Sequence, residues 1–141
     1  MMHVDDRLQI NEVLALLAYV ADEGLVDRVP EVFTSDAVYD MSSSGMRTFE
    51  GIGTITKALQ AMSVGGQGPQ AHFVTNVMIV SSGDDTAVTR SRGLMIMADG
   101  AVHAVNYDDT LRRENGAWRI ARRIILPIQA RPGAAEGAGM N

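Results

Sequence analysis

His72 is one of three histidines in this 141-residue sequence, with His3 and His103. Histidine gains and loses its proton near neutral pH, so this residue type suits general acid–base catalysis. In the segment AHFVTN, strand alternation would place His72, Val74 and Asn76 on one face, polar enough to line a cavity. A lone histidine in an apolar strand is more often structural. The three histidines show no metal-ligand spacing, so the sequence predicts no metal site.

Asp22 is a second unusual position. It lies where a helical pattern ends, and the negative pole there disfavours a carboxylate by about 0.3–1 kcal/mol. Helical spacing gives it one face with Ala15, Ala18 and Tyr19, which would turn it toward the domain interior. The competing interpretation, favoured by the residues alone, is a solvated carboxylate beside Glu23.

Composition excludes several classes of function. The sequence contains no cysteine, which removes thiolate chemistry and disulfides and fits a reducing compartment, so we expect a cytoplasmic protein. A net charge of −5 argues against a nucleic-acid partner. No apolar segment reaches membrane-spanning length, and we expect no membrane association. One basic cluster is interleaved with apolar residues and is typical of a solvated strand face: Arg112, Arg113, Arg119, Arg122 and Arg123.

The first half of the chain has helical periodicity. Apolar residues recur at helical spacing over 6–22, where Asp5 or Asp6 suits the N-cap and Gly24 suits the position after the last turn. A shorter helix is predicted over 27–33 and a third over 51–62. Short strands are predicted between them, at 37–41 and 47–50.

From residue 71 onward the pattern is that of strands separated by turn signals. The predicted strands are 71–81, 86–98, 101–113 and 118–127, with hairpin turns such as Asp99-Gly100 and Asn115-Gly116. Consecutive hairpins form an antiparallel meander, so the chain is predicted to be an α+β domain with helices on one sheet face. We expect one domain over 1–128 and a disordered tail over 129–141, which is rich in Gly, Ala and Pro.

Four segments carry a resemblance to a known superfamily: ADEGLVDRVPEVFTSDAVYD, FEGIGTITKAL, AHFVTNVMI and YDDTLRRENGAWRIARRI. They resemble nuclear-transport-factor-2-like proteins over roughly residues 6–127, and most of all the SnoaL-like group that contains scytalone dehydratase and hexachlorocyclohexane dehydrochlorinase. The resemblance implies a cone-shaped, cystatin-like fold in which three N-terminal helices pack on a curved antiparallel sheet.

In those two enzymes an aspartate near the end of the first helix holds a histidine on the first long strand. The matching positions are Asp22 and His72. The resemblance therefore implies a cofactor-independent lyase or dehydratase in which this pair moves protons on a small apolar, carbonyl-bearing substrate of polyketide, steroid or terpenoid type. Two departures make scytalone itself a poor candidate: Ala21 replaces a tyrosine, and the strand over 86–98 has no histidine.

Other side chains are candidates to orient such a substrate or polarise its carbonyl group, since phenol and amide donors can meet a developing oxyanion. Asn76 is favoured among them because it lies four residues from His72. Whether His103 or Asp109 reaches the pocket stays open. The candidate substrate-binding residues are Tyr19, Tyr39, Asp40, Asn76 and Tyr107.

Two alternatives remain. Asp40 resembles the proton-carrying aspartate of ketosteroid isomerases, which favours an isomerase or polyketide cyclase with Tyr19 or Asp109 holding an enolate; Asp40 is also a plausible turn cap. A non-catalytic ligand-binding protein, or one resembling dioxygenase small subunits, is the second alternative. Apolar residues on both faces of the segment Leu94 to Met97 favour a homodimer or homotrimer.

Overall fold

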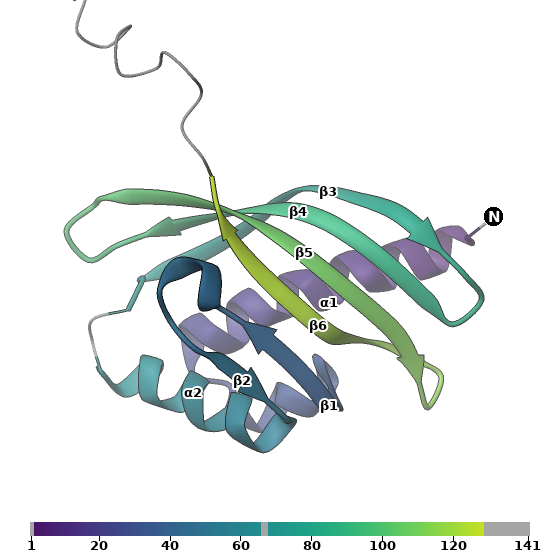
Figure 1. The fold of residues 1–141 in the computed structure, drawn as a ribbon, viewed down its shortest axis with the longest axis horizontal. Helices are drawn as coiled ribbons and strands as arrows, with labels where there is room; N and C mark the ends of the chain where they lie inside the picture. Colours follow the sequence, from purple (N-terminus) through teal and green to yellow (C-terminus); the bar gives the residue numbers. More distant parts are fainter. Residues whose placement is uncertain (1, 66–67, 129–141) are drawn as a thin grey trace, which may run out of the picture.

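The computed structural model describes residues 2–65 and 68–128, and the predicted tail at 129–141 lies outside this range. The chain forms an α+β domain, as predicted (Figure 1). The helical elements are α1 (Val4–Glu23), the 3-10 helix η1 (Val26–Glu31), the 3-10 turn η2 (Ser42–Ser44) and α2 (Ile52–Gly65). The strands are β1 (Phe33–Asp40), β2 (Thr48–Glu50), β3 (Ala71–Ser82), β4 (Thr86–Ile96), β5 (Val102–Glu114) and β6 (Ala117–Pro127).

The six strands form one curved sheet in the order β2-β1-β6-β5-β4-β3. The meander from β3 to β6 is antiparallel, as the turn signals predict, and β3 is an edge strand. β1 departs from this pattern because it pairs parallel to β6, beginning where Phe33 meets Ile120. That long-range pairing starts β1 four residues before the predicted position. In Figure 1, α1 runs along one face of the long strands and α2 lies beside β1 and β2.

Helix α1 supplies much of the core. Its buried apolar residues fall at helical spacing and pack toward the sheet: Ile10, Val13, Leu14, Leu17 and Val20. Gly24 ends the helix in the left-handed conformation, with φ 65°, as predicted. The predicted cap was wrong: His3 occupies the N-cap position without a side-chain bond, and Asp5 and Asp6 lie inside the first turn. None of the described helices is long and apolar enough to cross a membrane.

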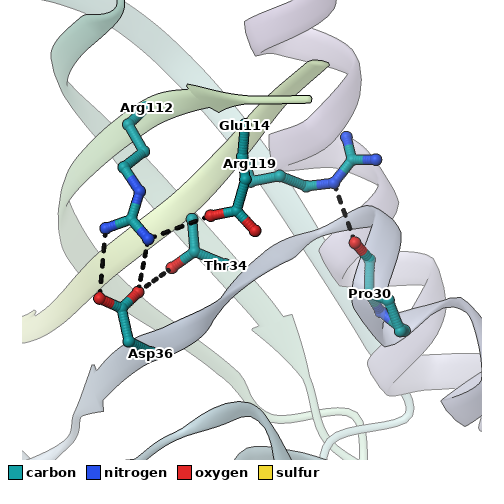
Figure 2. A network of polar contacts seen from close by, with 6 residues as sticks. All are labelled: Pro30, Thr34, Asp36, Arg112, Glu114 and Arg119. Atoms are coloured by element: carbon teal, nitrogen blue, oxygen red, sulfur yellow. Dashed lines mark hydrogen bonds and ion pairs between the residues drawn. The ribbon is translucent and has the colours of Figure 1, made fainter. Parts of the chain in front are cut away.

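Each arginine of the basic cluster contacts an acceptor group within the chain. Arg112 of β5 donates hydrogen bonds to Asp36 of β1, at 2.7 Å, and to Glu114, at 3.0 Å (Figure 2). Arg119 of β6 donates to the carbonyl of Pro30, at 2.9 Å (Figure 2). The remaining three arginines, Arg113, Arg122 and Arg123, each form an ion pair with an aspartate. The cluster therefore joins strands and η1, and it does not present a free cationic surface.

Asp6 anchors the start of α1 to the far end of the sheet. It accepts one hydrogen bond from the Trp118 indole N–H, at 3.0 Å, and its carboxylate lies 3.1 Å from Arg113, whose guanidinium stacks 4.8 Å from the indole centroid. The bond from Trp118, together with the Arg113 charge, lowers the pKa of Asp6 below its ordinary value. The charged carboxylate is thus part of the folded structure.

We expect Asp6 to make stability depend on acid pH. Its pKa is lowered by folding, so its contribution is complete above the ordinary aspartate pKa of about 3.9 and is lost as pH falls through the lower folded value. Thermal unfolding between pH 7 and pH 3 should show Asp6→Asn less stable than wild type at pH 7, with the gap closing in acid. Asp5→Asn, on the exposed side of the same turn, is the control. A difference in melting temperature between Asp6→Asn and wild type that did not change with pH would contradict this role.

Candidate active site

Asp22 and His72 are in direct contact through two hydrogen bonds. Asp22 Oδ1 lies 2.5 Å from His72 Nδ1, and Asp22 Oδ2 accepts the backbone N–H of His72 at 2.8 Å. Both side chains are about 15% exposed. A carboxylate at this distance requires the proton of the neutral ring to be on Nδ1, which leaves the Nε2 lone pair free.

The fold explains why the contact forms. Because β3 is an edge strand, the outward backbone N–H of His72 has no neighbouring strand to bind, and the end of α1 packs along this edge. The helix pole disfavours Asp22 by about 0.3–1 kcal/mol. A hydrogen bond to a charged group contributes about 1.5–3 kcal/mol, so the two bonds outweigh that cost. Asp22 therefore both orients the ring and closes part of an exposed sheet edge.

Depressions open on two sides of the pair. One, of about 330 Å³, lies between α1 and β3 and is lined by Ala15, Ala18, Tyr19 and Phe73. The other, of about 530 Å³, lies between the ends of α1 and α2 and the start of β3, and its lining includes Met62, Ser63 and Gln70. A small molecule can thus approach His72 without unfolding any element.

A third cavity, of about 280 Å³, lies between α2 and the β1–β2 hairpin and is almost wholly apolar. Met62 lines this cavity and also the depression beside the pair, so the two spaces are neighbours. Tyr39 is part of its wall, and burial raises the pKa of the Tyr39 phenol. The lining residues are Tyr39, Met41, Met46, Arg47, Phe49, Ile55, Ala58, Leu59, Ala61 and Met62.

A buried ion pair joins β5 to β6 on the inner sheet face. Arg123 of β6 donates to both oxygens of Asp109 on β5, at 2.8 and 3.0 Å, and its guanidinium lies 3.8 Å from the centroid of the Tyr107 ring. Burial alone would lower the pKa of Arg123, but the Asp109 charge raises it. On its other side the Tyr107 ring covers Gly93, where a Cβ atom would overlap the phenol. The Tyr107 ring therefore contacts both the Arg123 guanidinium and the backbone at Gly93.

Tyr107 is the buried phenol of this arrangement. Burial is the main cause that raises its pKa to about 12, and the charges of Asp109 and Asp22 contribute. It therefore keeps its proton at neutral pH. Asp109 is buried in its pair with Arg123, and His103 is exposed, so neither residue lines the spaces beside the pair.

The structure places Asp40 in a turn. Its Oδ1 accepts the N–H of Ser42 at 3.0 Å, the Ser42 hydroxyl at 2.6 Å and the Thr48 hydroxyl at 3.1 Å, and its Oδ2 faces Arg122. The bonds from Ser42, above all, hold the pKa of Asp40 below its usual range. A carboxylate stabilised in this way is a weak base. These contacts are those of a turn cap, one of the two roles that the sequence left open for Asp40.

Asn76 does not share the face of His72, and that prediction was wrong. The β3–β4 ladder shifts register between Thr75 and Met78, and Asn76 has φ 54°. This bulge turns Asn76 to the outer face, where it lies with Arg90 and Arg92. Strand alternation alone could not reveal the extra residue. Tyr19 lines the depression between α1 and β3 but is largely exposed.

Sequence reasoning missed two residues that shape the site: Gly93 and Arg123. Arg123 alternates with apolar residues along its strand, which could have indicated a buried cation, but its register depends on a shift in the β5–β6 ladder. Gly93 interrupts a β-rich run, a sign of close backbone approach. Within residues 2–65 and 68–128 no cluster of three His, Asp or Glu side chains is arranged to hold a metal ion.

Comparison with known families gives a match to the SnoaL-like domain over residues 2–124. The chain belongs to the SnoaL-like domain family. This SnoaL-like domain has the cystatin-like fold, with helices packed on one curved, mostly antiparallel sheet. No match is found among curated proteins.

Solved structures similar to this SnoaL-like domain include a proposed aromatic ring hydroxylase from Novosphingobium aromaticivorans, with 26% identity, a TM-score of 0.78, and coverage of 92% of this chain and 94% of that one. A proposed scytalone dehydratase from the same organism shares 17% identity, with a TM-score of 0.72 and coverage of 90% and 89%. LinA shares 16% identity, with a TM-score of 0.73 and coverage of 91% and 92%. The last two likenesses concern the fold.

Replacing Asp109 by Asn should destabilise this SnoaL-like domain by about 3–5 kcal/mol, because it leaves the buried charge of Arg123 unpaired. Urea unfolding measures the change. Asp108→Asn is a matched control, since the adjacent Asp108 pairs with Arg90 at the surface, where an ion pair is worth about 0–1 kcal/mol. Equal losses in the two variants would contradict the structural role assigned to the buried pair.

Proposed function

We propose that this SnoaL-like protein is a lyase of the dehydratase type, in which Asp22 and His72 act as a general acid–base pair. The observation that carries the proposal is the 2.5 Å contact between Asp22 Oδ1 and His72 Nδ1. Membership of the SnoaL-like family, and a fold shared with LinA and a proposed scytalone dehydratase, support the reaction class. The substrate would be a small, mainly apolar molecule that carries a carbonyl group.

In the proposed reaction His72 Nε2 removes a proton from the carbon next to the substrate carbonyl. The C–H electrons form a carbon–carbon double bond as the C–O bond to a β-hydroxyl group breaks. The imidazolium gives its proton to that hydroxyl, which leaves as water, and His72 returns to its neutral state. Asp22 stabilises the imidazolium throughout. Every proton moves between His72 and the substrate, so the scheme requires no cofactor.

The phenols have different proposed roles. Tyr39 lines the apolar cavity and would contact the substrate body, while Tyr19 would contact groups that extend into the depression between α1 and β3. Tyr107 keeps its proton at neutral pH and would form a rigid wall behind the pair. Asn76 faces the outer side and has no role in the proposal.

His72→Ala should lower the rate of water elimination by roughly 10²–10⁴-fold, the usual contribution of general acid–base catalysis. Asp22→Asn should cause a loss of the same order, because an amide can stabilise the wrong ring tautomer and does not stabilise the imidazolium. The assay follows the ultraviolet absorbance of conjugated enones formed from a panel of cyclic β-hydroxyketones. Melting temperatures of both variants show whether they fold.

Asp40→Ala separates the alternatives. If it leaves elimination unchanged while His72→Ala abolishes it, the dehydratase proposal stands. Loss with Asp40→Ala alone would instead favour the isomerase or cyclase reading, despite the bonds that occupy this carboxylate. A wild-type protein that binds members of the panel and converts none of them would favour the non-catalytic binding protein.

The proposal includes a homo-oligomer formed through the outer face of the sheet. Figure 1 shows α1 along one face of the long strands, and residues of α2 pack in the same core as α1, while several large apolar side chains on the outer face are exposed. Within the segment Leu94 to Met97, Leu94 and Ile96 lie on that face, whereas Met95 is half-buried on the inner one. The exposed residues are Phe73, Met78, Val80, Val88, Leu94, Ile96 and Val102.

Leu94→Arg should therefore reduce the molar mass in solution to that of a monomer, because a charge would be buried in the contact. Size-exclusion chromatography with light scattering measures the mass. Val64→Arg is the control, since Val64 is an exposed apolar residue on α2. A monomeric wild-type protein would contradict the assembly.

A further inference from the structure

The apolar cavity between α2 and the β1–β2 hairpin has one charged side chain in its lining, Arg47. Its guanidinium lies 5.0 Å from the centroid of the Phe49 ring, another lining residue. Among the residues that the structure describes, no carboxylate lies within ion-pair distance of Arg47, and the same holds for Arg7, Arg92 and Arg119, but of these four only Arg47 lines this apolar cavity. Arg47 is thus an unneutralised cation at the edge of an apolar space.

The size of the cavity limits what it can hold. A dry cavity of about 150 Å³ accommodates benzene, so the 280 Å³ here suits about two fused rings. A four-ring body would extend beyond the cavity. The lining also favours a flat ring, because Phe49 and Tyr39 supply aromatic contacts, and three methionines supply adaptable sulfur contacts: Met41, Met46 and Met62.

The position of Met62 relates the apolar cavity to the Asp22–His72 pair. Met62 lines both the apolar cavity and the depression that holds Asp22 and His72. Arg47 comes from the β1–β2 hairpin, so the cation and the shared methionine lie on different elements of the wall. A ligand with its rings in the cavity and an anionic group at Arg47 could contact Met62, which also lines the depression beside His72.

We propose that this cavity binds the two-ring body of an aromatic carboxylic acid, with the carboxylate at Arg47. A planar guanidinium matches a carboxylate with paired hydrogen bonds. The inference rests on the proposed function only in treating the cavity as part of the same site. It narrows the substrate class from any small apolar carbonyl compound to a bicyclic acid, and it assigns Arg47 as the residue that determines specificity.

The test measures binding and needs no turnover, so its outcome is separate from that of the elimination assay. Protein labelled with ¹³C at the methionine methyl groups is titrated with 2-naphthoate and with 2-naphthamide, a neutral analogue of the same shape. We expect 2-naphthoate to shift the methyl resonances of Met41, Met46 and Met62. The resonance of Met78, exposed on the outer sheet face, should not move. Shifts confined to methionines outside the cavity would overturn the proposal.

Arg47→Gln tests the role of the charge. Because Arg47 is exposed, its attraction to an anion is worth about 1 kcal/mol, so the variant should bind 2-naphthoate about fivefold more weakly and 2-naphthamide as the wild type does. Arg92→Gln, an exposed arginine on the outer face, is the matched control and should change neither affinity. Equal affinity of wild type for acid and amide, or equal loss of both ligands in Arg47→Gln, would overturn the assignment.

Discussion

The contact between the end of α1 and the edge strand β3 is the interaction on which the candidate site depends. One carboxylate, that of Asp22, binds both the ring and the backbone of His72. The backbone bond fixes the distance between helix and strand, and the ring bond fixes the tautomer. Without it the edge of β3 would expose an unpaired donor, and the ring would be free to rotate. Structural and proposed chemical roles therefore share the same two oxygens.

The interior of the sheet divides into a rigid polar part and an adaptable apolar part. The Arg123–Asp109 pair and the Tyr107 ring are tightly enclosed, and Gly93 leaves room for the phenol only because it has no side chain. The cavity beneath α2 is instead lined by flexible methionines. Under the proposed function, this arrangement would keep His72 in a fixed position while ligands of somewhat different shape occupied the neighbouring space.

The arginines that form a basic cluster in the sequence mostly connect elements of the fold to one another. Arg112 joins β5 to β1, and Arg113 joins the sheet to the first turn of α1. Arg47 differs because it faces an apolar space without an acidic partner in the described part of the chain. A cation without an acidic partner beside a cavity can bind an anionic ligand, whereas a cation in an ion-pair network holds the fold together. Only the tertiary contacts distinguish the two cases.

The sequence by itself determined the α+β class, the order of the elements and the hairpin meander, because helical spacing, strand alternation and turn residues are local properties of the chain. It also supplied Asp22 and His72, through resemblance. The tertiary structure decided what lies beside what: the parallel pairing of β1 with β6, the burial of Arg123 against Asp109, and the bulge that turns Asn76 outward. These depend on register between segments far apart in the chain, and a single extra residue reverses the face of a strand. Local periodicity carries no information about such a shift.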